Sequence, residues 1–145
     1  MPGSSRAKPL AAKLGLKEGV KAAIIGAPEG FAAALGKAVS AAAFHEPSDI
    51  AGLDDGLDYA HAFFMSAADL ALAFPVLAGK LDAAGALWVS WPKAATRKTS
   101  GISSDLDENS VRRIGLENGL VDVKVVSVDE TWSALKFVYR LKDRA

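Results

Sequence analysis

A short glycine-containing turn, GAPEG at residues 26–30, follows the apolar run AAII at residues 22–25. A strand, a glycine turn and a helix in this order open nucleotide-binding α/β domains, because glycine lets the backbone approach a cofactor. The same residues also suit a turn without a ligand. Pro28 is favoured at the first position of a helix, and Glu29 would then face the positive end of the helix dipole, where a ligand's phosphate or carboxylate would otherwise sit. This balance favours a helix-capping turn over a cofactor loop.

A second group of polar and aromatic residues is expected at the same edge of the sheet, because ligands of open α/β sheets bind beyond the carboxyl ends of the strands. In the order of the chain, this group comprises His45, Glu46, Ser66, Ser90, Trp91, Lys93, Arg97, Lys98, Asp129, Glu130 and Trp132. Tryptophan beside lysine and arginine suits an anionic or aromatic ligand, through stacking and charge-assisted hydrogen bonds. Alternatively, Trp91 and Trp132 pack on each other and the basic residues are only solvated. The sequence leaves both interpretations open.

Side chains that could catalyse a reaction are few. The chain has two histidines, His45 and His61, and no cysteine. His61 lies within an expected strand and is interpreted as structural. No Ser-His-Asp order, metal-ligand spacing or phosphate-loop signature is present, so we assign no catalytic residue and no metal site. Asp129 and Glu130 could supply a general base, although paired acids are common in hairpin turns.

The elements that must position these residues alternate along the chain. We expect helices at 9–14, after residue 30, at 66–81 with a kink or break at Pro75, and from Asp105 with Glu108 to Gly119. We expect strands at 20–25, 38–44, 57–64, 86–90, 121–128 and 135–141, the last two forming a hairpin. Alternating strands and helices predict a mostly parallel sheet between two helical layers, closed by the antiparallel hairpin. We therefore expect a single three-layer, Rossmann-like α/β domain over 9–145, after a disordered tail at 1–8.

Composition narrows the function classes. The chain has 145 residues, half of them apolar, which is enough to bury a sizeable core. Seventeen basic residues balance seventeen acidic ones, which disfavours binding to nucleic acid or to an anionic membrane. Residues 60–79 have the length of a membrane span, but His61, Asp69 and Pro75 interrupt them. We expect a soluble, cytoplasmic protein whose partner is a small anionic or aromatic ligand, or another protein.

Several segments resemble class I S-adenosylmethionine-dependent methyltransferases. The segment LDAAGALWVS at 81–90 is similar to the lead-in to the fifth strand of that fold, and LDYA at 57–60 to its fourth strand. A closer resemblance is to a family of small bacterial proteins of unknown function with a methyltransferase-like fold. It rests on LGLKEG at 14–19, APEG at 27–30, ALWVSWPK at 86–93, GLVDVKV at 119–125 and VDETWSALKFV at 128–138. The resemblance implies a methyltransferase-like Rossmann fold, shortened between its second and fourth strands.

The resemblance also implies where a cofactor would bind. Methyltransferases hold S-adenosylmethionine with an acid at the end of the first strand, three spaced glycines, and an acid after the second strand. The corresponding residues here are Gly26, Glu29, Gly30 and Glu46, but the strand-end acid is absent and Pro28, which has no N–H, replaces the middle glycine. These departures predict a non-catalytic binding or interaction protein on a degenerate methyltransferase scaffold, with no cofactor. The alternative is an S-adenosylmethionine-dependent methyltransferase with an altered cofactor loop.

Overall fold

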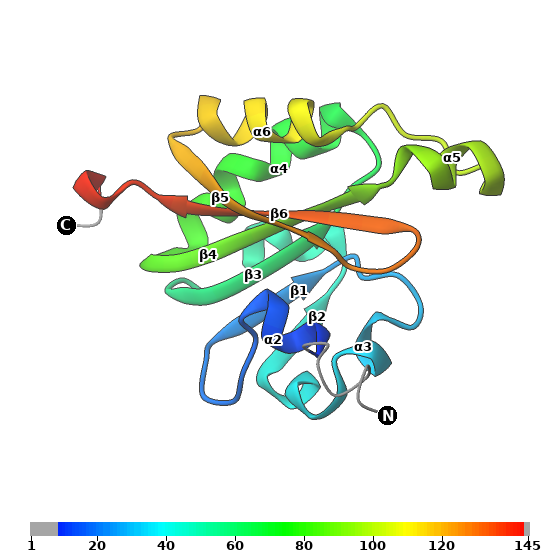
Figure 1. The fold of residues 1–145 in the computed structure, drawn as a ribbon. Helices are drawn as coiled ribbons and strands as arrows, with labels where there is room; N and C mark the ends of the chain where they lie inside the picture. Colours follow the sequence, from blue (N-terminus) through cyan, green and yellow to red (C-terminus); the bar gives the residue numbers. More distant parts are fainter. Residues whose placement is uncertain (1–8, 144–145) are drawn as a thin grey trace.

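The computed structural model describes residues 9–143, so the tail expected at 1–8 lies outside the described part. One sheet of six strands runs through the molecule in the order β2-β1-β3-β4-β6-β5 (Figure 1). The strands are β1 (Ala22–Ile25), β2 (Ala42–His45), β3 (Leu57–Phe63), β4 (Leu81–Pro92), β5 (Leu120–Ser127) and β6 (Trp132–Tyr139). The first four are parallel, and β6 is antiparallel to both β4 and β5. The expected mostly parallel sheet with an antiparallel C-terminal hairpin is confirmed.

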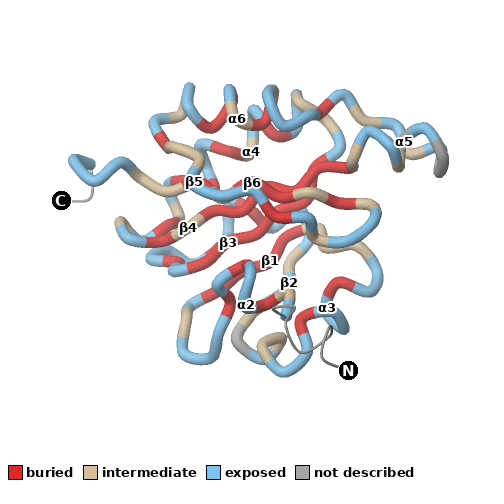
Figure 2. Tube along the Cα trace, in the orientation of Figure 1, coloured by how far each residue is buried: buried red, intermediate tan, exposed pale blue. Residues whose placement is uncertain are grey.

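Helices cover both faces of this sheet. They are α2 (Leu10–Leu14), α3 (Phe31–Ala34), α4 (Ala67–Lys80), α5 (Ala94–Ser100) and α6 (Glu108–Glu117). In Figure 1, α4 and α6 lie above the sheet, whereas α2 and α3 lie below it. One 3₁₀ helix, η2 (Pro47–Gly52), connects β2 to β3, as the shortened topology predicts. Figure 2 shows the buried residues concentrated along the strands and on the helix faces that cover them.

The core divides into an upper and a lower cluster because successive strand residues point to opposite faces. In β4, Leu87, Val89 and Trp91 belong to the cluster that packs under α4 and α6. Trp88 belongs to the lower cluster, where it is fully buried and its indole N–H donates to the carbonyl oxygen of Leu14 at 2.8 Å. This alternation decides on which face of the sheet each tryptophan side chain packs.

Two local expectations about helices are wrong: α4 has no break at Pro75, and α6 does not begin at Asp105. Helix α4 runs unbroken through Pro75, whose ring lies exposed on the solvent side of the helix. The carbonyl that loses its partner at Pro75 is that of residue 71, which is also exposed and can bond water. Helix α6 begins at Glu108 and is capped by Asp107, whose carboxylate accepts from the backbone N–H of Ser110 at 2.7 Å.

Asp105 stabilises a different helix from the one expected. Its carboxylate accepts a hydrogen bond from the backbone N–H of Ala67 at 2.7 Å, in the first turn of α4. The segment 91–104 contains the end of β4 and the short helix α5. The end of α6 is as predicted, because Gly119 adopts a left-handed conformation with φ of 86°.

Candidate functional site

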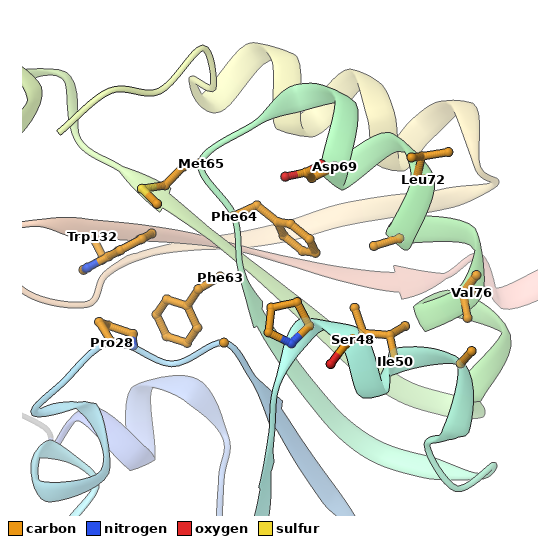
Figure 3. Close-up of a pocket in the computed structure, with 14 residues that line it drawn as sticks. Pro28, Ser48, Ile50, Phe63, Phe64, Met65, Asp69, Leu72, Val76 and Trp132 are labelled. Atoms are coloured by element: carbon orange, nitrogen blue, oxygen red, sulfur yellow. The ribbon is translucent and has the colours of Figure 1, made fainter.

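A pocket of about 850 Å³ opens at the carboxyl edge of the sheet (Figure 3). Gly26 and Pro28 reach it from the end of β1, Phe64 and Met65 from the end of β3, and Trp132 from the start of β6. The chain leaves β1 toward β2 on one side and leaves β3 toward β4 on the other. Such a reversal is the topological switch point at which open α/β sheets bind their ligands.

The pocket walls are mainly apolar and partly exposed. Met65, Leu72 and Val76 line it with exposed fractions of 50%, 77% and 39%, although they are large apolar side chains. Asp69, in the first turn of α4, is the one titratable residue among the lining residues. Figure 3 shows its carboxylate turned from α4 toward the strand-end residue Phe64. The pocket is therefore mainly hydrophobic, and Asp69 is its single acidic residue.

A smaller pocket of about 220 Å³ adjoins the larger one, and Gly26 lines both. Glu46, which follows β2, and Ala27 contribute to the smaller pocket. Gly26 has φ of 68°, and a Cβ there would lie 3.4 Å from Cγ of Pro47. A side chain at this position would therefore strain the backbone and narrow the junction of the two pockets. Gly26 and Glu46, predicted from separate segments, are thus brought together.

Glu29 does not have the role expected from the sequence. Helix α3 begins only at Phe31, after Gly30 in a left-handed conformation with φ of 91°, and α3 is four residues long. Glu29 precedes the helix and is exposed, and neither Glu29 nor Gly30 is among the residues that line the two pockets. The expected placement of Pro28 and Glu29 in the first turn of a helix is wrong, because the first turn of α3 contains no acidic residue and no side chain caps it.

Trp91 and Trp132 lie at the same end of the sheet but on opposite faces. In the β4–β6 pairing, Trp91 is opposite Ser133, and Trp132 is opposite Pro92. Trp91 belongs to the upper cluster, whereas Trp132 belongs to the lower one and contacts the ring of Phe63 edge-on at 5.3 Å. Both lie in strands and are buried, so the alternative in which they pack on each other is wrong.

Lys93 holds the turn between β5 and β6. Its ammonium donates to the hydroxyl of Ser127 and to the carbonyl oxygen of Asp129, each at 2.6 Å. The carboxylate of Asp129 accepts from the backbone N–H groups of Thr131 and Trp132, each at 2.8 Å. These bonds give Lys93 and Asp129 a structural role in the hairpin.

The remaining members of the second group lie outside the larger pocket. Thr96, in α5, donates to the carbonyl oxygen of Glu130 at 2.8 Å, and Lys98 is exposed on the same helix. The side chain of Arg97 lies outside the described part of the structure. Ser66 caps α4 by accepting from the backbone N–H of Asp69 at 3.2 Å. Of the residues predicted at this edge, Trp132 therefore lines the larger pocket, while His45 and Glu46 line the smaller one.

A buried chain of polar groups lies under the pocket. The hydroxyl of Tyr59 is 3.0 Å from Nδ1 of His61, and Nε2 of His61 is 2.7 Å from the hydroxyl of Ser90. The imidazole is fully buried and stacks on Phe63, with ring centres 4.5 Å apart. Burial lowers the pKa of His61 to about 3, so its imidazole is neutral at pH 7. Burial also raises the pKa of Tyr59. The structural interpretation of His61 fits this geometry.

Several pocket residues were missed by the sequence reasoning. Asp69, Met65, Leu72 and Val76 line the larger pocket but are not among the site residues predicted from the sequence. Their position in the segment that follows β3 could have identified them, because the carboxyl ends of β3 and β1 lie side by side at the ligand-binding edge of the sheet. Within residues 9–143 no cluster of histidines and acids could hold a metal ion, and no helix is long and apolar enough to cross a bilayer.

No protein-family model and no curated protein match the chain in sequence. Solved structures match it in fold. Magnesium protoporphyrin IX methyltransferase from Synechocystis with bound SAH matches with a TM-score of 0.61 at 14% identity, over 90% of this chain and 78% of that one. The N-methyltransferase NodS from Bradyrhizobium japonicum matches with a TM-score of 0.60 at 15% identity, over 94% of each chain. Mitomycin 7-O-methyltransferase matches with a TM-score of 0.64 at 12% identity, over 91% of this chain and 53% of that one. The chain thus has the Rossmann-like fold of class I S-adenosylmethionine-dependent methyltransferases.

Proposed function

We propose that the chain binds S-adenosylmethionine at the switch point between β1 and β3 and acts as a methyltransferase on a small molecule. The observation that carries this proposal is the position of the larger pocket, which opens at that switch point and shares Gly26 with the smaller one. Two adjoining pockets can hold a cofactor in one and the acceptor of its methyl group in the other. The neighbouring folds support the choice of cofactor, since one of them was solved with SAH bound.

The smaller pocket has groups that fit the adenosine part of the cofactor. Glu46 follows β2, and its carboxylate can accept hydrogen bonds from two vicinal ribose hydroxyls. Phe44, 43% exposed in the same pocket, offers an apolar surface to a base. Gly26 allows close approach of a ligand to the backbone. Glu29 lines neither pocket, so its carboxylate does not compete with a ligand there.

The larger pocket has groups that fit a methyl acceptor. S-adenosylmethionine supplies an electrophilic methyl group when it is bound. The apolar side chains of Phe64, Leu72 and Val76 would keep water from the reacting atoms. The carboxylate of Asp69 can accept a hydrogen bond from the acceptor and orient it.

A second candidate is a protein that binds the same ligand without catalysis. It is favoured by the absence of an acid at the end of β1, where Gly26 directly follows Ile25, and by the single titratable residue, Asp69, among those that line the larger pocket. Pro28 at the pocket also offers no N–H to a ligand. Both candidates require the cofactor to bind, and they differ in turnover.

Calorimetry with S-adenosylhomocysteine, the demethylated product, tests the shared step. We expect a dissociation constant of about 10 μM, which corresponds to roughly −7 kcal/mol. Glu46→Gln should weaken binding about tenfold or more, because charge-assisted hydrogen bonds contribute about 1.5–3 kcal/mol. Glu29→Gln is the matched control, since it removes a carboxylate of the neighbouring loop that lines neither pocket. It should leave the dissociation constant unchanged.

No heat of binding at about 1 mM S-adenosylhomocysteine would refute the proposal, because the affinity would then be weaker than about −4 kcal/mol. Equal effects of Glu46→Gln and Glu29→Gln would place the ligand elsewhere. If the product binds, mass spectrometry of reactions with S-adenosylmethionine and a library of small amines and alcohols separates the two candidates. Formation of a methylated compound supports the enzyme, and its absence supports the binding protein.

A further inference from the structure

We propose that the larger pocket receives an apolar, ring-containing amine, whose ammonium or amino group lies beside Asp69. This inference rests on the proposed function in one respect, because it identifies the ligand of the larger pocket with the methyl acceptor. The binding chemistry itself follows from the pocket walls. It can therefore be tested without the cofactor.

The apolar character of the ligand follows from exposed side chains that line the pocket. Met65, Leu72 and Val76 are large apolar residues with substantial exposure, and all three face this one cavity. The affinity gained from burial rises with the apolar surface that a ligand covers, so a ligand with an apolar body binds best here. A pocket of about 850 Å³ is in the range of sites that enclose molecules of this kind.

The ring follows from the aromatic walls at the strand ends. Phe63, Phe64 and Trp132 all line the pocket, and Phe63 and Trp132 meet edge-on with ring centres 5.3 Å apart. Figure 3 shows Phe63, Phe64 and Trp132 along the side of the pocket opposite Leu72 and Val76. Flat groups gain affinity beyond that from burial alone when they stack on aromatic side chains or meet their edges.

The amine follows from the charge of the pocket. Asp69 is the one titratable residue among the lining residues, and no lysine, arginine or histidine is among them. Lys93, the basic residue near Trp132, donates instead to Ser127 and Asp129 at the β5–β6 turn. An anionic ligand would meet only a like charge, whereas an amine can donate a charge-assisted hydrogen bond to the Asp69 carboxylate. The sequence predicts an anionic or aromatic ligand, or another protein; the proposal keeps the aromatic ring and replaces the negative charge with a positive one.

Two probes of the same shape and opposite charge test the inference directly. 2-Naphthylmethylamine and 2-naphthoate are titrated into the cofactor-free protein, and binding is followed by calorimetry. We expect the amine to bind about tenfold more tightly than the acid, because the Asp69 carboxylate attracts the ammonium of the first probe and repels the carboxylate of the second. Equal affinities, or tighter binding of the acid, would overturn the inference.

Substitution of Asp69 checks that this carboxylate sets the preference. Asp69→Asn should reduce the amine-to-acid ratio by about threefold to fivefold, which is the size expected for an exposed charge pair. Asp105→Asn is the matched control, because Asp105 supports the same end of α4 through Ala67 but does not line the pocket. It should lower the melting temperature and leave the ratio unchanged. A ratio that falls equally in both variants would overturn the assignment to Asp69.

This test is independent of the cofactor titration. If S-adenosylhomocysteine binds but the two naphthyl probes bind equally, the inference about the amine fails and the proposed function stands. If the amine binds selectively but S-adenosylhomocysteine does not bind, the pocket chemistry stands and the methyltransferase proposal fails.

Discussion

Lowering the pH from 7 to 5 should destabilise the fold through His61. The neutral imidazole has one donor and one acceptor nitrogen, and these face the hydroxyls of Tyr59 and Ser90 at 3.0 and 2.7 Å. Protonation would bury a positive charge among the aromatic rings, because the ring is fully buried and stacks on Phe63. The unfolded chain can bind this proton freely.

The size of the effect follows from the two pKa values of His61. Burial lowers the pKa from 6.5 in the unfolded chain to about 3 in the folded protein. Since the folded pKa is the lower one, stability is complete above about 6.5 and is lost as the pH falls toward 3. Each pH unit in this window costs about 1.4 kcal/mol, so His61 alone should cost about 2 kcal/mol at pH 5.

Urea unfolding of the wild type and of His61→Gln at pH 7 and pH 5 measures this contribution. The variant should be less stable at pH 7 by about 1–3 kcal/mol, because buried partners lose a hydrogen bond. Its further loss between pH 7 and 5 should be smaller than that of the wild type by about 2 kcal/mol. His45→Gln removes the other histidine and should retain the wild-type loss. The reasoning is refuted if wild type and His61→Gln lose the same free energy of unfolding over this range.

Three further predictions concern stability and ligand detection. Gly115→Ala should lower the free energy of unfolding by about 1–3 kcal/mol, measured in urea, because a Cβ there would overlap the ring of Phe137; an unchanged midpoint would show that the ring can move aside. Lys93→Ala should destabilise the fold by about 1–2 kcal/mol in thermal unfolding, since the ammonium holds the β5–β6 turn, and an unaltered melting curve would contradict that structural role. Binding of 2-naphthylmethylamine should change the fluorescence of Trp132, because Trp132 lines the pocket. Trp132→Phe should therefore abolish the change, and Trp91→Phe should preserve it. The reverse result would place the probe on the face of the sheet where Trp91 lies.

Much of the fold could be predicted from local patterns. Apolar runs without alternation indicate strands that are buried on both faces, and the run at 22–25 forms β1, which is buried throughout. Gly119, a residue that tolerates left-handed backbone, ended the helix where it was expected to. The order of these elements along the chain then predicts a parallel sheet with a closing hairpin, because crossover connections are restricted in hand and length.

Local patterns failed where a residue's role depends on a distant partner. Lys93 was expected either to contact an anionic ligand or to be solvated, but its hydrogen-bond partners, Ser127 at the end of β5 and Asp129 in the β5–β6 turn, lie more than thirty positions away. Asp105 was expected to begin the helix that follows it, yet it caps α4 through Ala67. The side of the sheet on which Trp132 lies depends on strand register, since a shift by one residue would reverse its face.

The sequence alone determined the elements and their order, because hydrophobic period and turn residues act over a few neighbouring positions. It also determined that Gly26 and Glu46 follow the first two strands, and hence that they meet at one edge. Only the tertiary structure decided that Gly30 would precede the helix in a left-handed conformation and leave Glu29 outside the pockets. It also decided that α4 would bring Asp69 opposite the ends of β1 and β3. A cavity is the space that packing leaves between elements far apart in the chain, so its shape and charge depend on how those elements pack and not on any one segment.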